Sequence, residues 1–195
     1  MRYSSEHKQQ TREKVLTAAA RTIREQGPER ISVAAVMGEA GLTHGGFYAH
    51  FASKEALVAA SIEHMFEQMR ARIDELTEGR GAREALRNYI DFYLSERHVQ
   101  ARGQGCPVAA LGSDLPRLDD AARKAFADGM AIQHRRLRAF FKSLDVADPD
   151  DSAHSLRSEL LGALLSARLV SAGERKKVLE ASRQSLKRRF DLMAS

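Results

Sequence analysis

A polar stretch at residues 43–50 holds the side chains best suited to chemistry in this chain. It reads THGGFYAH and offers a hydroxyl at Thr43, an imidazole at His44 and a phenol at Tyr48. Hydrogen-bond donors and acceptors of this kind can read the edges of base pairs in the major groove of DNA. Gly45 has no side chain, so the backbone there can approach bases or the sugar–phosphate closely. These residue types predict base contacts by Thr43, His44, Gly45 and Tyr48.

Two short helices around a glycine turn are expected to position this stretch. Ser32 can cap the first helix, and Gly41 supplies the turn. Thr43 can cap the second helix, whose Phe47 and Phe51 lie four residues apart and therefore face the same, inward side. A helix, a glycine turn and a second helix with a polar leading edge form the helix-turn-helix arrangement that enters the major groove.

The same residues resemble the DNA-binding domain of the TetR/AcrR family of bacterial transcriptional regulators. The resemblance rests on three segments, which are GLTHGGFYAHF at 41–51, SKEAL at 53–57 and TREKVLTAAARTIREQG at 11–27. It implies a dimeric repressor that binds a palindromic operator in double-stranded DNA and is released by a small-molecule or thiol-reactive inducer. The operator sequence, the inducer and the choice between repression and activation stay open.

The resemblance also implies contacts with the DNA backbone, which position a protein without reading sequence. Tyr48, His50 and Lys54 match family positions of this kind. The starts of the first two helices supply four further phosphate candidates, which are Lys8, Thr11, Arg12 and Ser32. Internal packing or local hydrogen bonding is the alternative role for Tyr48 and His50.

Composition and hydrophobic periodicity predict an all-α protein of about nine helices. The chain has 195 residues, four prolines and no tryptophan, and it is rich in Ala, Leu, Arg and Glu. A helix-turn-helix DNA-binding domain is expected over residues 1–54, and a helical ligand-binding and dimerisation domain over residues 55–195. A long helix from about Ser53 should join the two, and another helix is expected over residues 82–102.

Two long helices near the C-terminus are expected over residues 149–172 and 174–193, with Gly173 between them. They carry apolar residues at helical steps, which are Leu156, Leu160, Leu164, Leu179, Leu186 and Phe190. The spacing alone fits core packing within one chain and a four-helix dimer interface equally well. The resemblance favours a homodimer, because TetR-like proteins dimerise through their last two long helices.

An inducer pocket among the middle helices is also implied by the resemblance. Its candidate lining residues are aromatic, Met and His side chains, which are Phe66, Met69, Tyr89, Phe92, Tyr93, Met130 and His134. Plain core packing is the alternative for each of them, because apolar stripes at helical spacing are typical of any helical bundle.

Cys106 is a candidate sensor in the same region. It precedes Pro107 at a predicted helix N-terminus, where backbone N–H groups and the helix dipole stabilise a thiolate. Its segment, RGQGCPVAALGSDL, resembles the electrophile- and oxidant-responsive branch of the family. One alternative is structural packing of a small apolar residue. Another is a small all-helical thiol enzyme using Cys106, although no catalytic motif accompanies it.

Charge and targeting signals bound the remaining possibilities. A net charge of +5 suits an anionic partner. The basic excess at residues 168–195 fits either a solvated helix face or a second patch that binds a nucleic acid or an acidic partner. The single cysteine excludes an intramolecular disulfide. The absence of a long apolar run or a secretion signal predicts a cytoplasmic protein with no membrane contact. No cofactor is expected, and the seven histidines lie too far apart along the chain to suggest a metal site.

Overall fold

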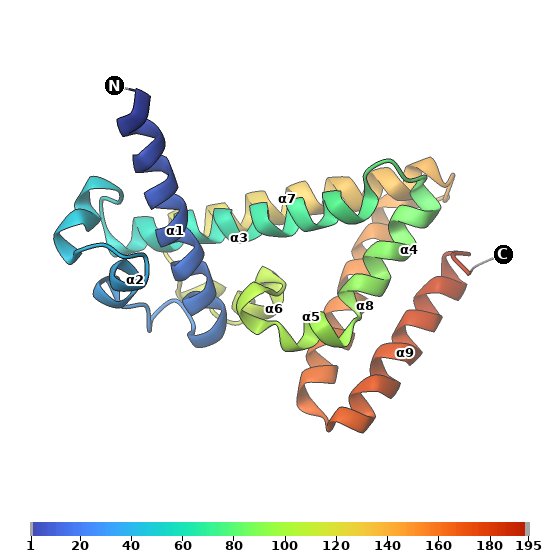
Figure 1. Ribbon diagram of the computed structural model, residues 1–195. Helices are drawn as coiled ribbons and strands as arrows, with labels where there is room; N and C mark the ends of the chain where they lie inside the picture. The colour runs from blue at the N-terminus through green and yellow to red at the C-terminus, as the bar shows by residue number, and fades with distance from the viewer. Residues whose placement is uncertain (1, 194–195) are drawn as a thin grey trace. The chain divides into compact units, whose positions relative to one another are not determined.

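The computed structural model describes residues 2–193, and within them it contains nine α-helices, three 3-10 helices and no β-strand (Figure 1). The all-α prediction is therefore confirmed. In chain order the elements are α1 (Arg2–Gln26), α2 (Val33–Glu39), η1 (His44–Ala49), α3 (Lys54–Thr77), α4 (Ala82–Tyr93), α5 (Glu96–Gln100), η2 (Arg102–Gln104), α6 (Pro107–Leu111), η3 (Leu115–Arg117), α7 (Asp120–Ser143), α8 (Pro149–Leu169) and α9 (Ala172–Arg189).

The helices form two compact units. The first contains the residues up to Gln68 together with Cys106–Gly129, and the second contains Met69–Gly105 together with the residues from Met130 onward. Both α3 and α7 contribute residues to each unit. These packing units do not coincide with the two functional domains expected from the sequence, whose boundary after residue 54 stays a prediction.

The core of the first unit forms around the apolar side of α1. Val15, Ala19 and Ile23 recur every four residues and are completely buried, as expected for one stripe of an amphipathic helix. The helix contacts both α2 and α6. Phe66 of α3 packs edge-on against Phe126 of α7, with ring centroids 5.3 Å apart. The first helix of the helix-turn-helix, α2, thus packs against α1 of the same unit.

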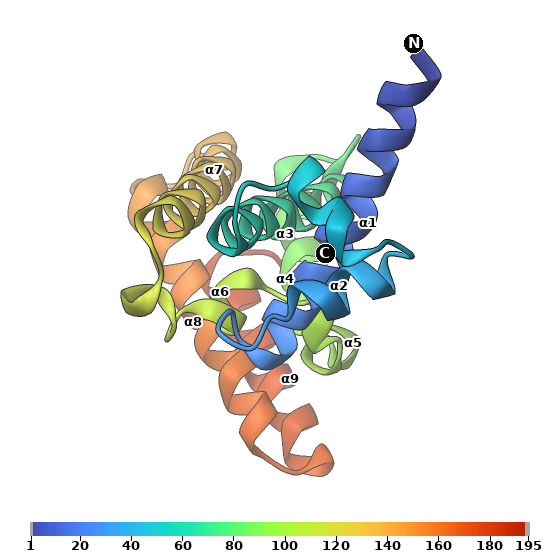
Figure 2. The same cartoon turned by 90° about the vertical axis from the view of Figure 1, so that its left-hand side faces the viewer.

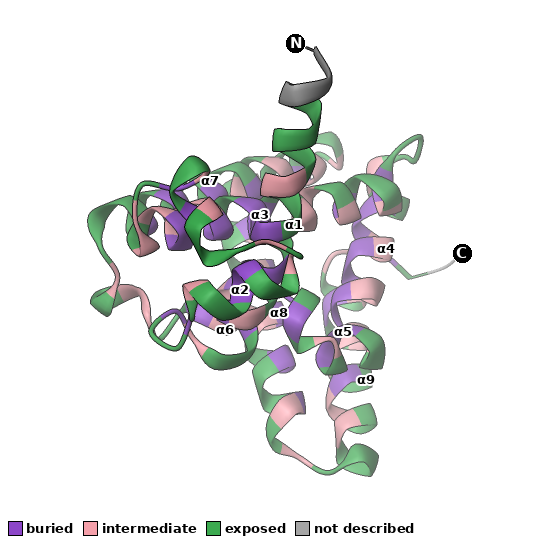
Figure 3. Cartoon of the chain, turned by 60° about the vertical axis from the view of Figure 1, so that its left-hand side comes forward, coloured by how far each residue is buried: buried purple, intermediate pink, exposed green. Residues whose placement is uncertain are grey.

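The second unit is built on α8 and α9, which lie side by side in both views (Figures 1 and 2). Their facing sides are buried, as the purple segments of Figure 3 show, and Leu160, Leu164 and Leu186 have no exposed surface. The α4 helix joins this pair through an ion pair, in which the Lys187 ammonium lies 2.6 Å from a carboxylate oxygen of Asp91.

Two predicted helix boundaries differ from the structure. The expected helix over 82–102 stops at Tyr93, and Ser95 starts α5 by accepting a hydrogen bond from the His98 amide at 3.1 Å. The break between the last two helices falls at Ser171, not at Gly173, which lies inside α9. Ser171 and Glu174 form a reciprocal capping box there, and this arrangement is a stronger helix start than a glycine.

Candidate nucleic-acid interface

The turn of the helix-turn-helix is fixed by a glycine with a left-handed backbone. Gly41 has a φ of 76°, a conformation that L side chains rarely adopt. The Leu42 amide donates to the Met37 carbonyl at 2.9 Å, and the Gly41 amide donates to the Gly38 carbonyl at 3.0 Å. This pair of bonds is the Schellman motif that ends a helix. The predicted role of Gly41 is confirmed.

The second helix of the motif is shorter and tighter than predicted. Residues His44–Ala49 form a 3-10 helix. The consecutive Gly45 and Gly46 lower α-helix propensity at its centre, which accounts for the difference. Thr43 occupies the N-cap position as predicted, but its side chain accepts no capping hydrogen bond from the described residues. The hydroxyl is therefore not used to start the helix.

The side chains predicted to read bases lie together on the outer edge of this segment. Thr43, His44 and Gly45 are exposed, and Tyr48 is 70% exposed. The inward positions are filled by Phe47 and Phe51, which are 2% and 4% exposed and have stacked rings with centroids 5.7 Å apart. The aromatic pair holds the segment against the unit and leaves its polar edge facing outward.

Three of the predicted phosphate contacts gather beside this edge. The Arg12 guanidinium lies over the Phe51 ring, 5.0 Å from its centroid, a cation–π arrangement that fixes the side chain. Partial burial lowers the pKa of His50, and the positive charges of Lys8 and Arg12 lower it further. The buried Nδ1 of His50 has no hydrogen-bond partner among the residues described. Lys8 and Arg12 lie inside α1, not at the helix start where the sequence placed them, and together with His50 they form an electropositive corner.

The other predicted phosphate residues have partial local roles. Ser32 caps α2 as predicted, because its hydroxyl accepts a hydrogen bond from the Ala35 amide at 3.3 Å. Thr11 is half-buried on α1. The Lys54 ammonium donates a hydrogen bond to the Glu29 carbonyl at 3.1 Å. The two residues are far apart in the sequence, so no local pattern predicts this bond. A phosphate contact by Lys54 would therefore share the ammonium with this carbonyl.

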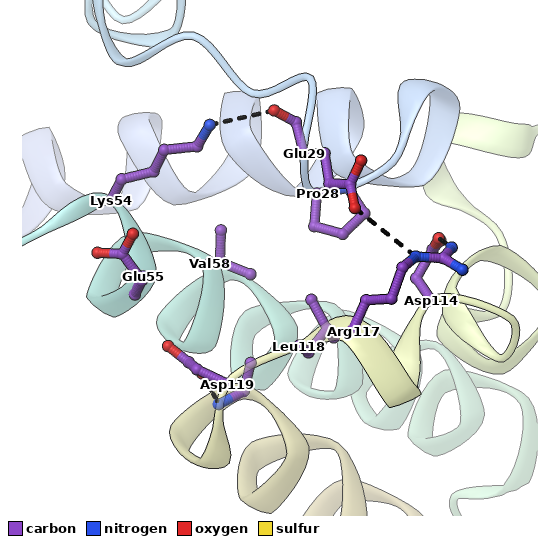
Figure 4. Close-up of a pocket in the computed structure, with 10 residues that line it drawn as sticks. Pro28, Glu29, Lys54, Glu55, Val58, Asp114, Arg117, Leu118 and Asp119 are labelled. Atoms are coloured by element: carbon purple, nitrogen blue, oxygen red, sulfur yellow. Dashed lines mark hydrogen bonds and ion pairs between the residues drawn. The ribbon is translucent and has the colours of Figure 1, made fainter.

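A small pocket of about 240 Å³ lies in the first unit beside Lys54 (Figure 4). Glu29 lines it and pairs with Arg117, with 3.6 Å between its carboxylate and the Arg117 Nε. Its apolar surface comes from Pro28, Val58 and other residues, and four carboxylates line it. The sequence predicted a role only for Lys54 among the lining residues, since they come from three separated segments of the chain.

The predicted inducer-pocket residues divide between the two units. Phe66 belongs to the first, where it packs against Phe126. The remaining aromatic, Met and His candidates belong to the second, and they are Met69, Tyr89, Phe92, Tyr93, Met130 and His134. Within that unit the Gln133 amide donates to the hydroxyl of buried Tyr89 at 3.1 Å and to the Met69 sulfur at 3.4 Å. These contacts are those of a packed core with a polar bond inside it.

Cys106 occupies the predicted position at the start of a helix, but it is only 2% exposed. The structure adds a cation from α1, since the Arg24 guanidinium is electrostatically coupled to Cys106. Burial lowers the pKa of Arg24 to about 10, and the nearby Cys106 opposes that shift. Nothing in the spacing of Arg24 and Cys106 signals this proximity.

The apolar residues predicted to form a dimer interface are mostly inside the chain. Five leucines on α8 and α9 are at most 2% exposed, and they are Leu156, Leu160, Leu164, Leu179 and Leu186. Phe190 packs against Phe141, with ring centroids 4.7 Å apart. These side chains pack α8 and α9 against their own unit, so they do not form an exposed apolar surface.

A capped helix-turn-helix with an exposed polar edge defines the class of DNA-binding transcriptional regulators. Residues 15–61 match the family model described as bacterial regulatory proteins, tetR family. The match identifies these residues as the N-terminal helix-turn-helix domain of this family of regulators. Within residues 2–193 no helix has the length and apolar character needed to cross a membrane.

Relatives and solved structures agree with this assignment. An uncharacterized HTH-type transcriptional regulator of Lactococcus lactis subsp. lactis is 25% identical over 186 residues, which are 93% of each chain. A second, from Mycobacterium tuberculosis, is 29% identical over 167 residues, 81% of this chain and 84% of the relative. The reduced form of E. coli NemR has a similar fold, with a TM-score of 0.75 at 23% identity over 92% of this chain and 96% of that chain. A TetR regulator from Chloroflexus aurantiacus gives 0.78 at 22% identity over 95% and 94%.

Proposed function

We propose that the protein is a homodimeric repressor that binds a pseudo-palindromic operator and leaves it when an inducer binds. The observation that carries the proposal is the exposed edge of Thr43, His44, Gly45 and Tyr48 beside the cations Lys8 and Arg12. Uncharged donors can read base edges while the cations hold phosphates on either side. A two-fold dimer presents two such edges, which matches a palindrome.

The dimer contact proposed here uses an exposed face of α8. Gly162, Leu165, Ser166 and Leu169 recur at helical steps of three and four and are all exposed, and Leu169 is 86% exposed. Gly162 and Ser166 are small and allow a second helix to approach closely. Burial of two large apolar side chains per protomer supplies the driving force. This face replaces the buried leucines as the candidate interface.

DNA binding is tested by fluorescence anisotropy with the DNA that flanks the gene, over a range of salt concentrations. Arg12→Ala removes one phosphate contact, so we expect weaker binding to all sequences and a shallower dependence on salt. Lys14→Ala is the matched control, because Lys14 is exposed on the same helix but does not belong to the proposed interface. Equal losses of DNA affinity in both variants would mean that only the net charge matters, and they would contradict a phosphate contact by Arg12.

Sequence reading is tested separately with Thr43→Ala and His44→Ala. Each should lower the preference for the operator over unrelated DNA, since a good base contact contributes about 1–3 kcal/mol of discrimination. Binding to unrelated DNA should stay unchanged. Unchanged preference in both variants would place base reading elsewhere.

The proposed inducer is a small molecule or a thiol-reactive compound acting at Cys106. The electrostatic interaction of Arg24 with Cys106 supports the second, because a nearby cation favours the reactive thiolate, whereas the 2% exposure of Cys106 requires local opening before a reagent reaches it. The test is a mobility shift with and without N-ethylmaleimide, on the wild-type protein and on Cys106→Ser. Release of only the wild-type protein supports a thiol switch, and release of neither directs the search to a non-covalent ligand.

A further inference from the structure

We propose that His134, Asp150 and His154 bind one divalent transition-metal ion of the zinc type. All three lie in the second unit, His134 on α7 and the other two at the start of α8. Each offers one ligand atom, and the three atoms lie within 4.8 Å of one another. His134 is also a candidate inducer-pocket residue, whereas Asp150 and His154 have no other proposed role.

The distances between the three side chains are already close to those of a metal site. His134 Nε2 lies 3.0 Å from Asp150 Oδ1, and His154 Nε2 lies 3.9 Å from Asp150 Oδ2. The centroids of the two imidazole rings are 4.1 Å apart. The two imidazoles therefore lie against each other, and the carboxylate of Asp150 faces one ring nitrogen of each.

The backbone accounts for this juxtaposition. Asp150 and His154 are four residues apart, so they share one face of α8. The chain reverses between α7 and α8 through Asp145, whose φ of 52° is left-handed. That reversal brings His134 back against the first turn of α8. Histidines 20 residues apart carry no recognisable spacing, which is why the sequence did not predict this site.

The donor set selects the class of metal. Two imidazoles and one carboxylate suit Zn²⁺, Co²⁺ or Ni²⁺, whereas Mg²⁺ and Ca²⁺ prefer oxygen ligands alone. Bond lengths of about 2.0–2.2 Å in a tetrahedron place neighbouring ligand atoms roughly 3.4 Å apart. His154 and Asp150 are exposed, so small rotations of their side chains can close the remaining gap. Three protein ligands leave a fourth position for water.

Two arginines beside the cluster act in opposite ways. Arg138 Nε lies 3.3 Å from Asp150 Oδ1 and can hold that oxygen while Oδ2 faces the metal, as an outer contact that orients a ligand. Arg157 donates to His154 Nδ1 at 3.1 Å. A metal at Nε2 keeps the proton of a neutral imidazole on Nδ1, so the Arg157 donor loses its acceptor. Arg157 therefore opposes metal binding.

His134 adds an independent observation. Its Nδ1 is buried without a hydrogen-bond partner among the residues that the structure describes. The contact of Nε2 with the Asp150 carboxylate places the ring proton on Nε2. A metal at Nε2 would move this proton to Nδ1, for which the described residues offer no acceptor, so a water molecule would have to accept it.

The experiment is a Co²⁺ titration of the untagged full chain, followed by the visible absorption of bound Co²⁺, with circular dichroism as a check of folding. We expect one equivalent to bind to the wild-type protein. Asp150→Asn and His154→Gln, both at exposed positions, should each weaken binding at least about 10-fold. Asp151→Asn is the matched control, because it removes the neighbouring exposed carboxylate and should leave binding unchanged.

Arg157→Gln provides a test in the opposite direction. It removes a positive charge and supplies a carbonyl that can accept from Nδ1–H, so Co²⁺ should bind more tightly than to the wild-type protein. No saturable binding by the wild-type protein would overturn the proposal. Equal binding by the wild-type and Asp150→Asn proteins, or weaker binding by Arg157→Gln, would overturn it as well.

Discussion

The ring of Phe66 lies so close to the backbone of Gly129 that no side chain fits between them. A Cβ at residue 129 would stand 2.3 Å from two atoms of the ring. Both residues belong to the first unit, and Phe66 is itself 2% exposed and packed against Phe126. The missing side chain at Gly129 thus sets how closely α7 approaches α3 there.

Gly129→Ala should destabilise the protein, although alanine is the better helix former. The methyl group must displace a buried aromatic ring, and overpacking of this kind costs about 1–3 kcal/mol. The measurement is the midpoint of urea unfolding. Gly38→Ala is the control, because nothing lies within 4 Å of its added Cβ and it sits inside α2. That variant should gain about 0.5–1 kcal/mol, and a similar gain in Gly129→Ala would contradict the close approach.

The free energy of unfolding should decrease as the pH is lowered, because of buried His98. Its Nδ1 donates to the Tyr93 carbonyl at 2.8 Å, and burial lowers its pKa, with the Tyr93 bond acting against the shift and Arg168 adding to it. The unfolded chain therefore binds a proton that the folded chain does not. The stabilising contribution is complete above the unfolded pKa of about 6.5 and is lost as pH falls below it.

The measurement is the free energy of unfolding of the wild-type and His98→Gln proteins between pH 5 and 8. The wild-type protein should lose stability towards pH 5 with an added slope of at most about 1.4 kcal/mol per pH unit. His98→Gln retains a donor for the Tyr93 carbonyl but cannot take up the proton. Parallel profiles for the two proteins would show that His98 does not contribute to this dependence.

Sequence patterns predicted much of the local structure of the helix-turn-helix. The Ser32 cap and the Gly41 turn follow from short-range rules, since each depends on residues at most a few positions away. The same rules placed Thr43 at the start of η1 but did not predict that its capping hydrogen bond is missing, and they failed at Gly173. Consecutive glycines tightened η1, and the Ser171 capping box moved the start of α9.

Contacts between distant segments were beyond these rules. The spacing of Leu160 and Leu186 showed that they face inward, but it could not show whether their partner is the same chain or another. The structure buries both within their own unit. The pairing of Lys54 with Glu29 and the cluster of His134 with His154 likewise depend on chain reversals that no local pattern fixes.

Cys106 should react slowly with thiol reagents in the folded protein. It is 2% exposed, so a reagent as large as Ellman's can reach it only after local opening of the chain. We expect at least about a tenfold slower reaction than in denaturant, measured by the absorbance of the released thiolate. Equally fast reaction in both conditions would show that the thiol is accessible, and it would strengthen the proposal of a covalent inducer.

DNA binding should tighten as pH falls, through His50. In the free protein its pKa is lowered by partial burial and by the charges of Lys8 and Arg12. A bound phosphate opposes those charges and favours the protonated ring, so binding takes up a proton. Affinity should therefore rise as pH falls from 7.5 towards 6, by up to about tenfold per pH unit for one coupled proton. His50→Gln should show a flatter pH dependence in the same anisotropy titration at fixed salt. An unchanged dependence would mean that the proton is taken up elsewhere and that His50 does not face the phosphate.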